Sequence, residues 1–325
     1  MVRRHFLAVS TIWGSKPLFG GQVNPPLAMV GSFRPPISPD EFVQNFEIAN
    51  GSFLFLISSR LPGGARLVRT SPEGTVKWTW VAPSGRSYAG LGLRPSGAIV
   101  LPYFVRKGRE PGGFLDELTQ TGAVVRTLRL PFATAVWEFV VTGDNLLTFR
   151  EDGSVVSMNL QTSAIRTLTP GLTRLESARV HVMSDSEVLI VDRLEARLGR
   201  LGLGTERCEW ATLEAPELAD SLRYFSERWR QSTASVQAGA VLRGPVVGAS
   251  CVATDGSFYF LLQPISRVKG AVLLRARRSS GVDARLLVQL PGKDLRRLLP
   301  HWLAVVENRL FLIYGDGYVD EYQLP

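Results

Sequence analysis

A polar turn followed by a short apolar run recurs six times along this 325-residue chain. The runs are FLFLI from residue 53, AIVL from 98, LLTF from 146, VLIV from 188, FYFLL from 258 and LFLIY from 310. Their first residues are 45, 48, 42, 70 and 52 positions apart, and all but one of these spacings match the length of a single four-stranded propeller blade. Such a repeat constrains the fold strongly, because every copy has to form the same structural unit.

Two further strand candidates follow each of the first five runs. In the first repeat, ARLVRT leads to a Glu73-Gly74 turn and then to TVKWTWVA, where apolar and polar residues alternate. The middle runs are unbroken, as expected for strands covered on both faces, whereas the outer candidates alternate. The sequence therefore predicts an all-β, six-bladed β-propeller with four-stranded antiparallel blades.

The last repeat contains only three strands, HWLAVV, LFLIY and YVDEYQL, before the sequence ends. An unpaired strand candidate, LAMVGSF, occupies residues 27–33 ahead of the first repeat. Because an open strand edge needs a partner, we expect this N-terminal strand to pair with the last blade and close the ring.

The 70-residue spacing contains an additional segment. Residues 216–230 predict a helix, since Pro216 suits its first turn and four apolar residues form one stripe. Those residues are Leu218, Leu222, Phe225 and Trp229. We expect one propeller over residues 23–325 with a helical insertion at about 214–245. Ser38-Pro39-Asp40-Glu41 has the form of a capping box and predicts a short turn ahead of the first repeat, and residues 293–299 predict a further short helix.

The repeated pattern, as in TDGSFYFLL and TSPEGTVKWTW, resembles the bacterial six-bladed propellers of the NHL-like group. The resemblance covers nearly the whole chain and implies a disc with a central channel and a binding surface on one face. Relatives that act as lactonases or lyases hold a channel metal with carboxylates, Asn or His. That ligand set cannot be assigned to positions of this sequence, so the resemblance implies a fold more than a function.

Residues 1–22 are interpreted as a signal or flexible segment. Arg3 and Arg4 precede an apolar run from Phe6 to Trp13, which is typical of the start of a secretory signal peptide. Lys16 interrupts this run and no small-residue cleavage site follows, so a periplasmic or extracellular location is the first expectation and a cytoplasmic one the alternative. No stretch reaches the roughly 18 apolar residues of a transmembrane helix.

The chain carries a net charge of +8 and an isoelectric point near 9.9, which favours acidic partners or anionic ligands. No nucleic-acid-binding motif accompanies this charge. Arginines follow the middle runs of the first five repeats, in loops expected to share one face of the disc with the inserted helix. The predicted ligand-binding residues are Arg60, Arg106, Arg150, Arg193, Arg267 and, on the helix, Arg230. The alternative is that these arginines only solvate strand ends.

Catalytic motifs are absent: there is no G-x-S-x-G, no P-loop and no H-E-x-x-H. His181 and His301 fall on innermost-strand candidates, where they could face the channel or serve as hydrogen-bonded structural residues. Cys208 and Cys251 fall on different strand layers and should not form a disulfide. We predict no cofactor and no metal.

These observations favour a monomeric, non-enzymatic module that binds an acidic ligand or protein on the arginine-bearing face. The alternative is a metal-dependent propeller hydrolase or lyase with its site in the central channel. A structural role in a cell-envelope assembly is a third hypothesis, which the sequence does not separate from the first. Whether the chain is an enzyme stays open at this stage.

Overall fold

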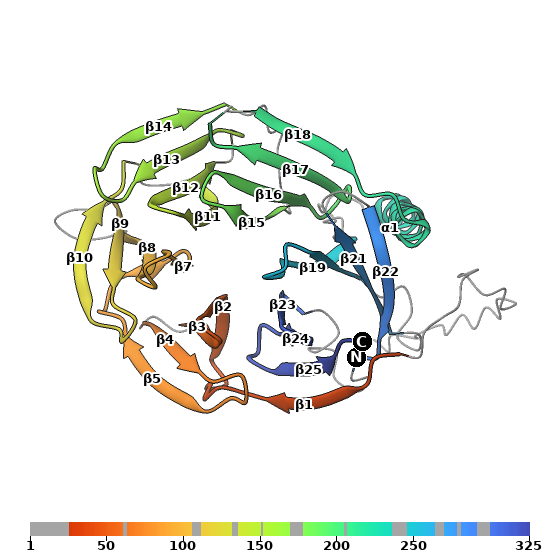
Figure 1. The fold of residues 1–325 in the computed structure, drawn as a ribbon, viewed down its shortest axis with the longest axis horizontal. Coiled ribbons are helices and arrows are strands. Elements are labelled where there is room, and N and C mark those ends of the chain that lie inside the picture. Colours follow the sequence, from red (N-terminus) through yellow and green to blue (C-terminus); the bar gives the residue numbers. More distant parts are fainter. Residues whose placement is uncertain are drawn as a thin grey trace, which may run out of the picture.

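The computed structural model contains six antiparallel sheets arranged around a central space (Figure 1). It describes residues 26–60, 64–105, 112–131, 136–150, 152–169, 178–204, 207–235, 246–263, 270–277, 281–290 and 300–325, without the side chains of 136–137 and 228–235. The fold is a six-bladed β-propeller with four-stranded antiparallel blades, as the repeats predicted.

The strands follow one another from the channel outward in each blade. Blade 1 contains β2 (Glu41–Ala49), β3 (Ser52–Ser59), β4 (Ala65–Thr70) and β5 (Val76–Val81); blade 2 contains β6 (Ser87–Tyr88), β7 (Gly92–Leu93), β8 (Ile99–Val105), β9 (Gly112–Leu118) and β10 (Val124–Arg129). Blade 3 contains β11 (Val136–Thr142), β12 (Asn145–Arg150), β13 (Val155–Asn159) and β14 (Ile165–Leu168).

The second half of the ring repeats this arrangement. Blade 4 contains β15 (Ala178–Ser184), β16 (Glu187–Asp192), β17 (Arg197–Gly202) and β18 (Arg207–Thr212); blade 5 contains β19 (Val247–Val252), β20 (Phe258–Leu262), β21 (Ala271–Arg277) and β22 (Gly281–Val288). Blade 6 contains β23 (Trp302–Val306), β24 (Arg309–Ile313), β25 (Val319–Gln323) and, on its outer edge, β1 (Met29–Phe33). In every blade the second strand is almost fully buried.

The ring is closed by strands from opposite ends of the sequence (Figure 1). Strand β1 pairs antiparallel with β25, and Ser32 opposes Asp320 in the register. The Ser32 hydroxyl donates a hydrogen bond to Asp320 Oδ1 over 2.7 Å. This confirms the predicted closure and satisfies the edge that the last blade would otherwise expose.

The hydrophobic core is divided among the six interfaces between neighbouring blades. One buried cluster lies between each pair, for example Phe53 and Phe55 of blade 1 with Phe311 of blade 6. The Phe53 and Phe311 rings make an edge contact with centroids 4.9 Å apart. Each blade is therefore stabilised by both of its neighbours, which makes closure a property of the whole ring.

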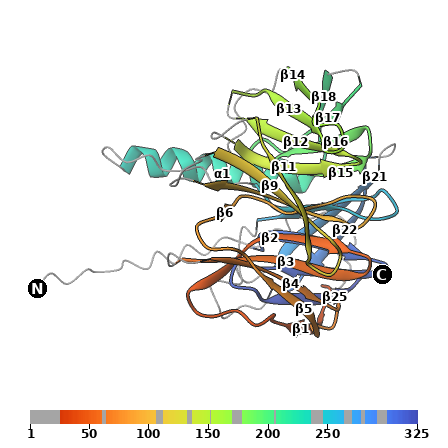
Figure 2. The same cartoon turned by 90° about the vertical axis from the view of Figure 1, so that its left-hand side faces the viewer.

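Helix α1 (Pro216–Ser235) is the one helix in the part of the chain that the structure describes. Buried Leu218 joins the core cluster between blades 4 and 5, and Glu217 makes an ion pair of 3.0 Å with Arg285 of β22. The helix is seen end-on in Figure 1 and projects beyond one face of the disc in Figure 2. No described helix is both long and apolar enough to cross a bilayer.

The remaining local predictions have mixed outcomes. The Ser38–Glu41 segment forms a turn ahead of β2, in which the Ser38 N–H donates to Glu41 Oε2 at 2.8 Å. Residues 293–299, predicted as a helix, lie outside the described ranges. The extent of the propeller and of the insertion stays a prediction, since residues 236–245 and 1–25 lie outside them as well.

Candidate functional site

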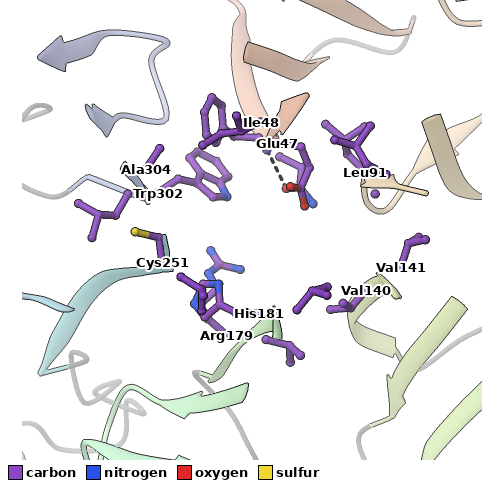
Figure 3. Close-up of a pocket in the computed structure, with 18 of the residues that line it drawn as sticks. Glu47, Ile48, Leu91, Val140, Val141, Arg179, His181, Cys251, Trp302 and Ala304 are labelled. Carbon is purple, nitrogen blue, oxygen red and sulfur yellow. Dashed lines mark hydrogen bonds between the residues drawn. The ribbon is translucent and has the colours of Figure 1, made fainter. Parts of the chain in front are cut away.

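The innermost strands of all six blades enclose a cavity of about 610 Å³ at the centre of the disc (Figure 3). One part of its wall is apolar and includes Ile48, Leu91, Val140 and Trp302. Another part carries charged and polar groups from blades 1, 3, 4 and 5. A concave site of this size with a few convergent polar groups is typical of small-ligand sites.

A cluster of charged and titratable side chains lies at the end of the cavity where the innermost strands begin. Arg179 of β15 donates a hydrogen bond from Nη1 to Glu138 Oε2 of β11, over 3.2 Å. Arg193 directly follows β16, and His301 directly precedes β23. We call these four residues, Glu138, Arg179, Arg193 and His301, the channel mouth. Blade-to-blade connections, including α1, emerge on this same face.

Arg193 holds blade 4 against blade 5. Its Nε donates to the Val247 carbonyl at 2.8 Å and its Nη2 to the Gly248 carbonyl at 2.6 Å. Burial, followed by repulsion from Arg179, lowers the pKa of Arg193 to about 10, so the guanidinium stays charged at neutral pH. Arg193 therefore contributes positive charge to the channel mouth while two of its donors are already used.

The two carboxyl groups that line the channel have raised pKa values. Burial, reinforced by repulsion from Glu138, raises the pKa of Glu47 to about 8. Burial also raises the pKa of Glu138, although the nearby charges of Arg179 and Arg193 oppose that rise. Glu47 is thus mostly neutral at pH 7, and the channel mouth keeps more positive than negative charge.

Both described histidines are neutral at pH 7. His181 Nε2 and Ser250 Oγ lie 2.8 Å apart, which joins the innermost strands of blades 4 and 5. Burial, then the charge of Arg179, lowers the pKa of His181 to about 4. Burial and the charges of Arg179 and Arg193 also lower the pKa of His301. His181 matches the structural, hydrogen-bonded interpretation, and the two rings lie two blades apart as expected.

The structure describes three of the six predicted arginine side chains. Arg60 follows β3 and is exposed, Arg150 ends β12 and lies 3.7 Å from Asp152, and Arg193 makes the carbonyl contacts given above. All three terminate second strands, so they share the face of the channel mouth. Arg106 and Arg267 lie outside the described residues, and Arg230 lies in α1 with its side chain undescribed.

Sequence reasoning missed Glu47, Glu138 and Arg179. Each is a charged residue in an innermost strand, within NFEIAN, VWEFVV and ARVHVM respectively. A charged side chain in a strand that faces a narrow channel costs free energy unless it forms an ion pair or binds a ligand. Charged residues inside the innermost-strand candidates would therefore have identified these positions.

Cys208 and Cys251 are both free thiols, as predicted. Within the described ranges, no three His, Cys, Asp or Glu side chains come close enough together to hold a metal ion. The predicted absence of a metal and a cofactor stays a prediction.

No protein-family model matches the chain, and no curated protein matches it either. Solved structures do match in fold. A catalytically inactive variant of virginiamycin B lyase from Staphylococcus aureus, in a structure with quinupristin, has a TM-score of 0.54 at 8% identity over 91% of this chain and 99% of that one.

Two Bacteroides proteins of unknown function are similar to a comparable degree. The protein from Bacteroides thetaiotaomicron has a TM-score of 0.54 at 13% identity, over 90% of this chain and 72% of that one. The protein from Bacteroides caccae has a TM-score of 0.51 at 12% identity, over 79% of this chain and 86% of that one. At such identities the likeness establishes the propeller fold alone.

Proposed function

We propose that this propeller is a non-enzymatic binding module that recognises an acidic partner or an anionic ligand on the face carrying the channel mouth. The observation that carries the proposal is the placement of arginine. Second strands from three different blades end at that face, and they place Arg60, Arg150 and Arg193 there. Arg179 lies on the same face. The net charge of +8 gives the whole protein a favourable long-range field for anions.

The exposed arginines supply the contacts. We call Arg60 and Arg150 the rim arginines; the first is exposed and the second has a side chain that is 39% exposed. A guanidinium presents a planar fork that matches carboxylate and phosphate oxygens. Arg193 is a poor contact because its donors serve carbonyl groups, so its role in the proposal is electrostatic.

Anion binding is tested with a fluorescent deca-glutamate peptide, by fluorescence anisotropy at low and physiological salt. We expect binding that weakens as salt rises, because the contacts are exposed charges. The variant Arg60→Glu/Arg150→Glu should bind at least about tenfold more weakly, since two attractive charges become repulsive.

A charge-matched variant on the opposite face provides the control. Lys77 and Arg207 are exposed and lie at the beginnings of outer strands, away from the channel mouth. Lys77→Glu/Arg207→Glu changes the net charge by the same amount and should bind the peptide with little loss. Equal weakening by the two variants would mean that total charge, rather than this face, governs binding, and the proposal would be wrong.

We further propose that the chain belongs to the bacterial NHL-like propellers and acts outside the cytoplasm as a monomeric scaffold or binding module. The recurrence of the same turn and strand order in the blades supports the first statement. The Arg3-Arg4 pair and the apolar run behind it support the second. N-terminal sequencing of protein recovered from periplasmic and cytoplasmic fractions tests export, and an intact N-terminus found only in the cytoplasm would contradict it.

A further inference from the structure

We propose that the central cavity binds one small monoanion with an apolar body, that Arg179 holds its charged group, and that ionisation of Glu47 opposes this binding. The inference shares the channel mouth with the proposed function but does not depend on the rim arginines. It concerns a small molecule inside the disc rather than a partner on its surface.

The apolar part of the ligand is inferred from the cavity wall. Figure 3 shows Ile48, Leu91, Val140 and Trp302 around the same open space as Arg179. Val182 also lines the cavity and has 41% of its surface exposed. An apolar side chain such as this one gains no free energy from contact with water. A ligand with an apolar body would cover these side chains and gain the free energy of their burial.

The charge of the ligand follows from an imbalance among the channel groups. Arg179 and Arg193 carry two positive charges, and the single carboxyl group of Glu138 beside Arg179 leaves a positive surplus whether it is ionised or protonated. The Arg179 side chain remains 33% exposed toward the cavity after its contact with Glu138. One negative charge on a ligand would offset this surplus, and a guanidinium with free donors suits a carboxylate or phosphate ester.

Glu47 is placed to control this balance. It lines the same cavity from β2 and lies close enough to Glu138 for the two carboxyl groups to repel each other. When Glu47 is protonated the surplus positive charge remains, and when it ionises that surplus falls by one charge. Since its pKa is about 8, anion binding should be full near pH 6.5 and weaker near pH 9.

The other titratable groups that line the cavity come from three further strands. Among the described lining residues they are Glu138 from β11, Arg179 and His181 from β15, and Cys251 from β19; the described lining residues of β7 and β23 are uncharged. His181, with a pKa of about 4, stays neutral above pH 6. Burial raises the pKa of Cys251, which stays a thiol. Arg193 and His301, just beyond the cavity, stay charged and neutral respectively.

The test uses 2-naphthoate as the probe and 2-naphthamide as its neutral counterpart, with binding to the full chain measured by calorimetry. We expect naphthoate to bind and naphthamide to bind at least about tenfold more weakly. Arg179→Gln should remove this preference, and Arg179→Lys, which keeps the charge but not the planar fork, should retain part of it. Glu47→Gln should abolish the pH dependence, whereas the unmodified chain should lose about fivefold or more in affinity between pH 6.5 and 9.

Three controls separate this inference from the proposed function and from unfolding. Arg207→Gln makes the same kind of substitution as Arg179→Gln at an exposed residue of outer strand β18, outside the cavity, and should leave the affinity unchanged. Arg60→Glu/Arg150→Glu should weaken peptide binding but not naphthoate binding. Circular dichroism confirms that each variant is folded. Equal affinities for naphthoate and naphthamide, no binding of either, or unchanged naphthoate binding by folded Arg179→Gln would each overturn the inference.

Discussion

Arg193 shows how one side chain can serve structure and electrostatics together. Its guanidinium bonds the carbonyl groups of Val247 and Gly248, and its own carbonyl accepts the N–H groups of Val246 at 2.8 Å and Val247 at 3.1 Å. Hydrogen bonds from both the main chain and the side chain of Arg193 therefore hold the beginning of β19 against the end of β16. This residue connects blades 4 and 5, which α1 separates in the sequence.

Replacing Arg193 should therefore lower stability. We expect Arg193→Gln to reduce the free energy of unfolding by about 1 to 3 kcal/mol, because two charged hydrogen bonds to buried carbonyls are lost. Arg223→Gln is the control, since Arg223 is 66% exposed and pairs with Asp220 on the helix surface. Urea unfolding monitored by tryptophan fluorescence measures both. Identical transitions for Arg193→Gln and the unmodified chain would contradict the structural role.

Glu41 contributes to the stability of the folded protein by an amount that depends on pH. Arg66 donates to both of its carboxylate oxygens over 2.8 Å, and this interaction, more than any other, lowers the pKa of Glu41 to about 2. Because the folded protein holds the ionised form, the stabilisation is present above the ordinary value of 4.5 and is lost as pH falls toward 2.

We expect Glu41→Gln to cost about 1 to 2 kcal/mol at pH 7 and progressively less between pH 5 and pH 2. The measurement is the difference in unfolding free energy between the two proteins across that pH range. A difference that stays constant, or that grows as pH falls, would show that the ionised carboxylate is not what stabilises the turn.

At the scale of single elements, blade 2 departs from its neighbours. Its innermost strand is broken into β6 and β7, which pair with β8 on either side of Pro102. Proline has no N–H to donate, so at this position only the Pro102 carbonyl bonds the inner chain, accepting from the Ala89 N–H over 2.8 Å. Gly92 in β7 then approaches β11 closely: a Cβ there would lie 2.5 Å from Val141 Cγ2.

Gly92→Ala should consequently destabilise the interface between blades 2 and 3 by about 1 to 3 kcal/mol through overpacking. The double variant Gly92→Ala/Val141→Ala should recover part of the loss, because the clashing methyl group is removed. Gly204→Ala is the matched control, since nothing lies within 4 Å of a Cβ at that position. Thermal unfolding measures all three, and equal melting temperatures for Gly92→Ala and Gly204→Ala would contradict the close contact.

Strands were predictable because their signals are local. The Asn50-Gly51 turn and the FLFLI run behind it specify β3 with little help from the rest of the chain, and the same holds in the other repeats. The break in blade 2 was not predicted, since it depends on whether the missing N–H of Pro102 faces the innermost strand or β9. The helix was predicted to end at residue 230 but extends to Ser235, because its final turns lack a clear stop signal.

At the scale of the whole molecule, the ring brings together residues that the sequence separates widely. Glu47, Glu138 and Arg179 lie on three blades, and only closure makes their strands face a common channel. The sequence could indicate their strands but not the direction of their side chains, which depends on blade packing. The arginine-bearing face and the cavity both depend on a closed ring, in which β1 and β25 pair in blade 6.

Closure is tested most directly by a disulfide across the β1–β25 pair. Gly31 opposes Glu321, and a Cβ built at Gly31 would lie 3.8 Å from the Cβ of Glu321, a separation that suits a disulfide. We predict that Gly31→Cys/Glu321→Cys forms an intramolecular bond on oxidation, identified by mass spectrometry of the linked peptides, and raises the free energy of unfolding by about 2 to 4 kcal/mol. Failure to form this bond in the folded monomer, or its formation only between molecules, would contradict the closed ring.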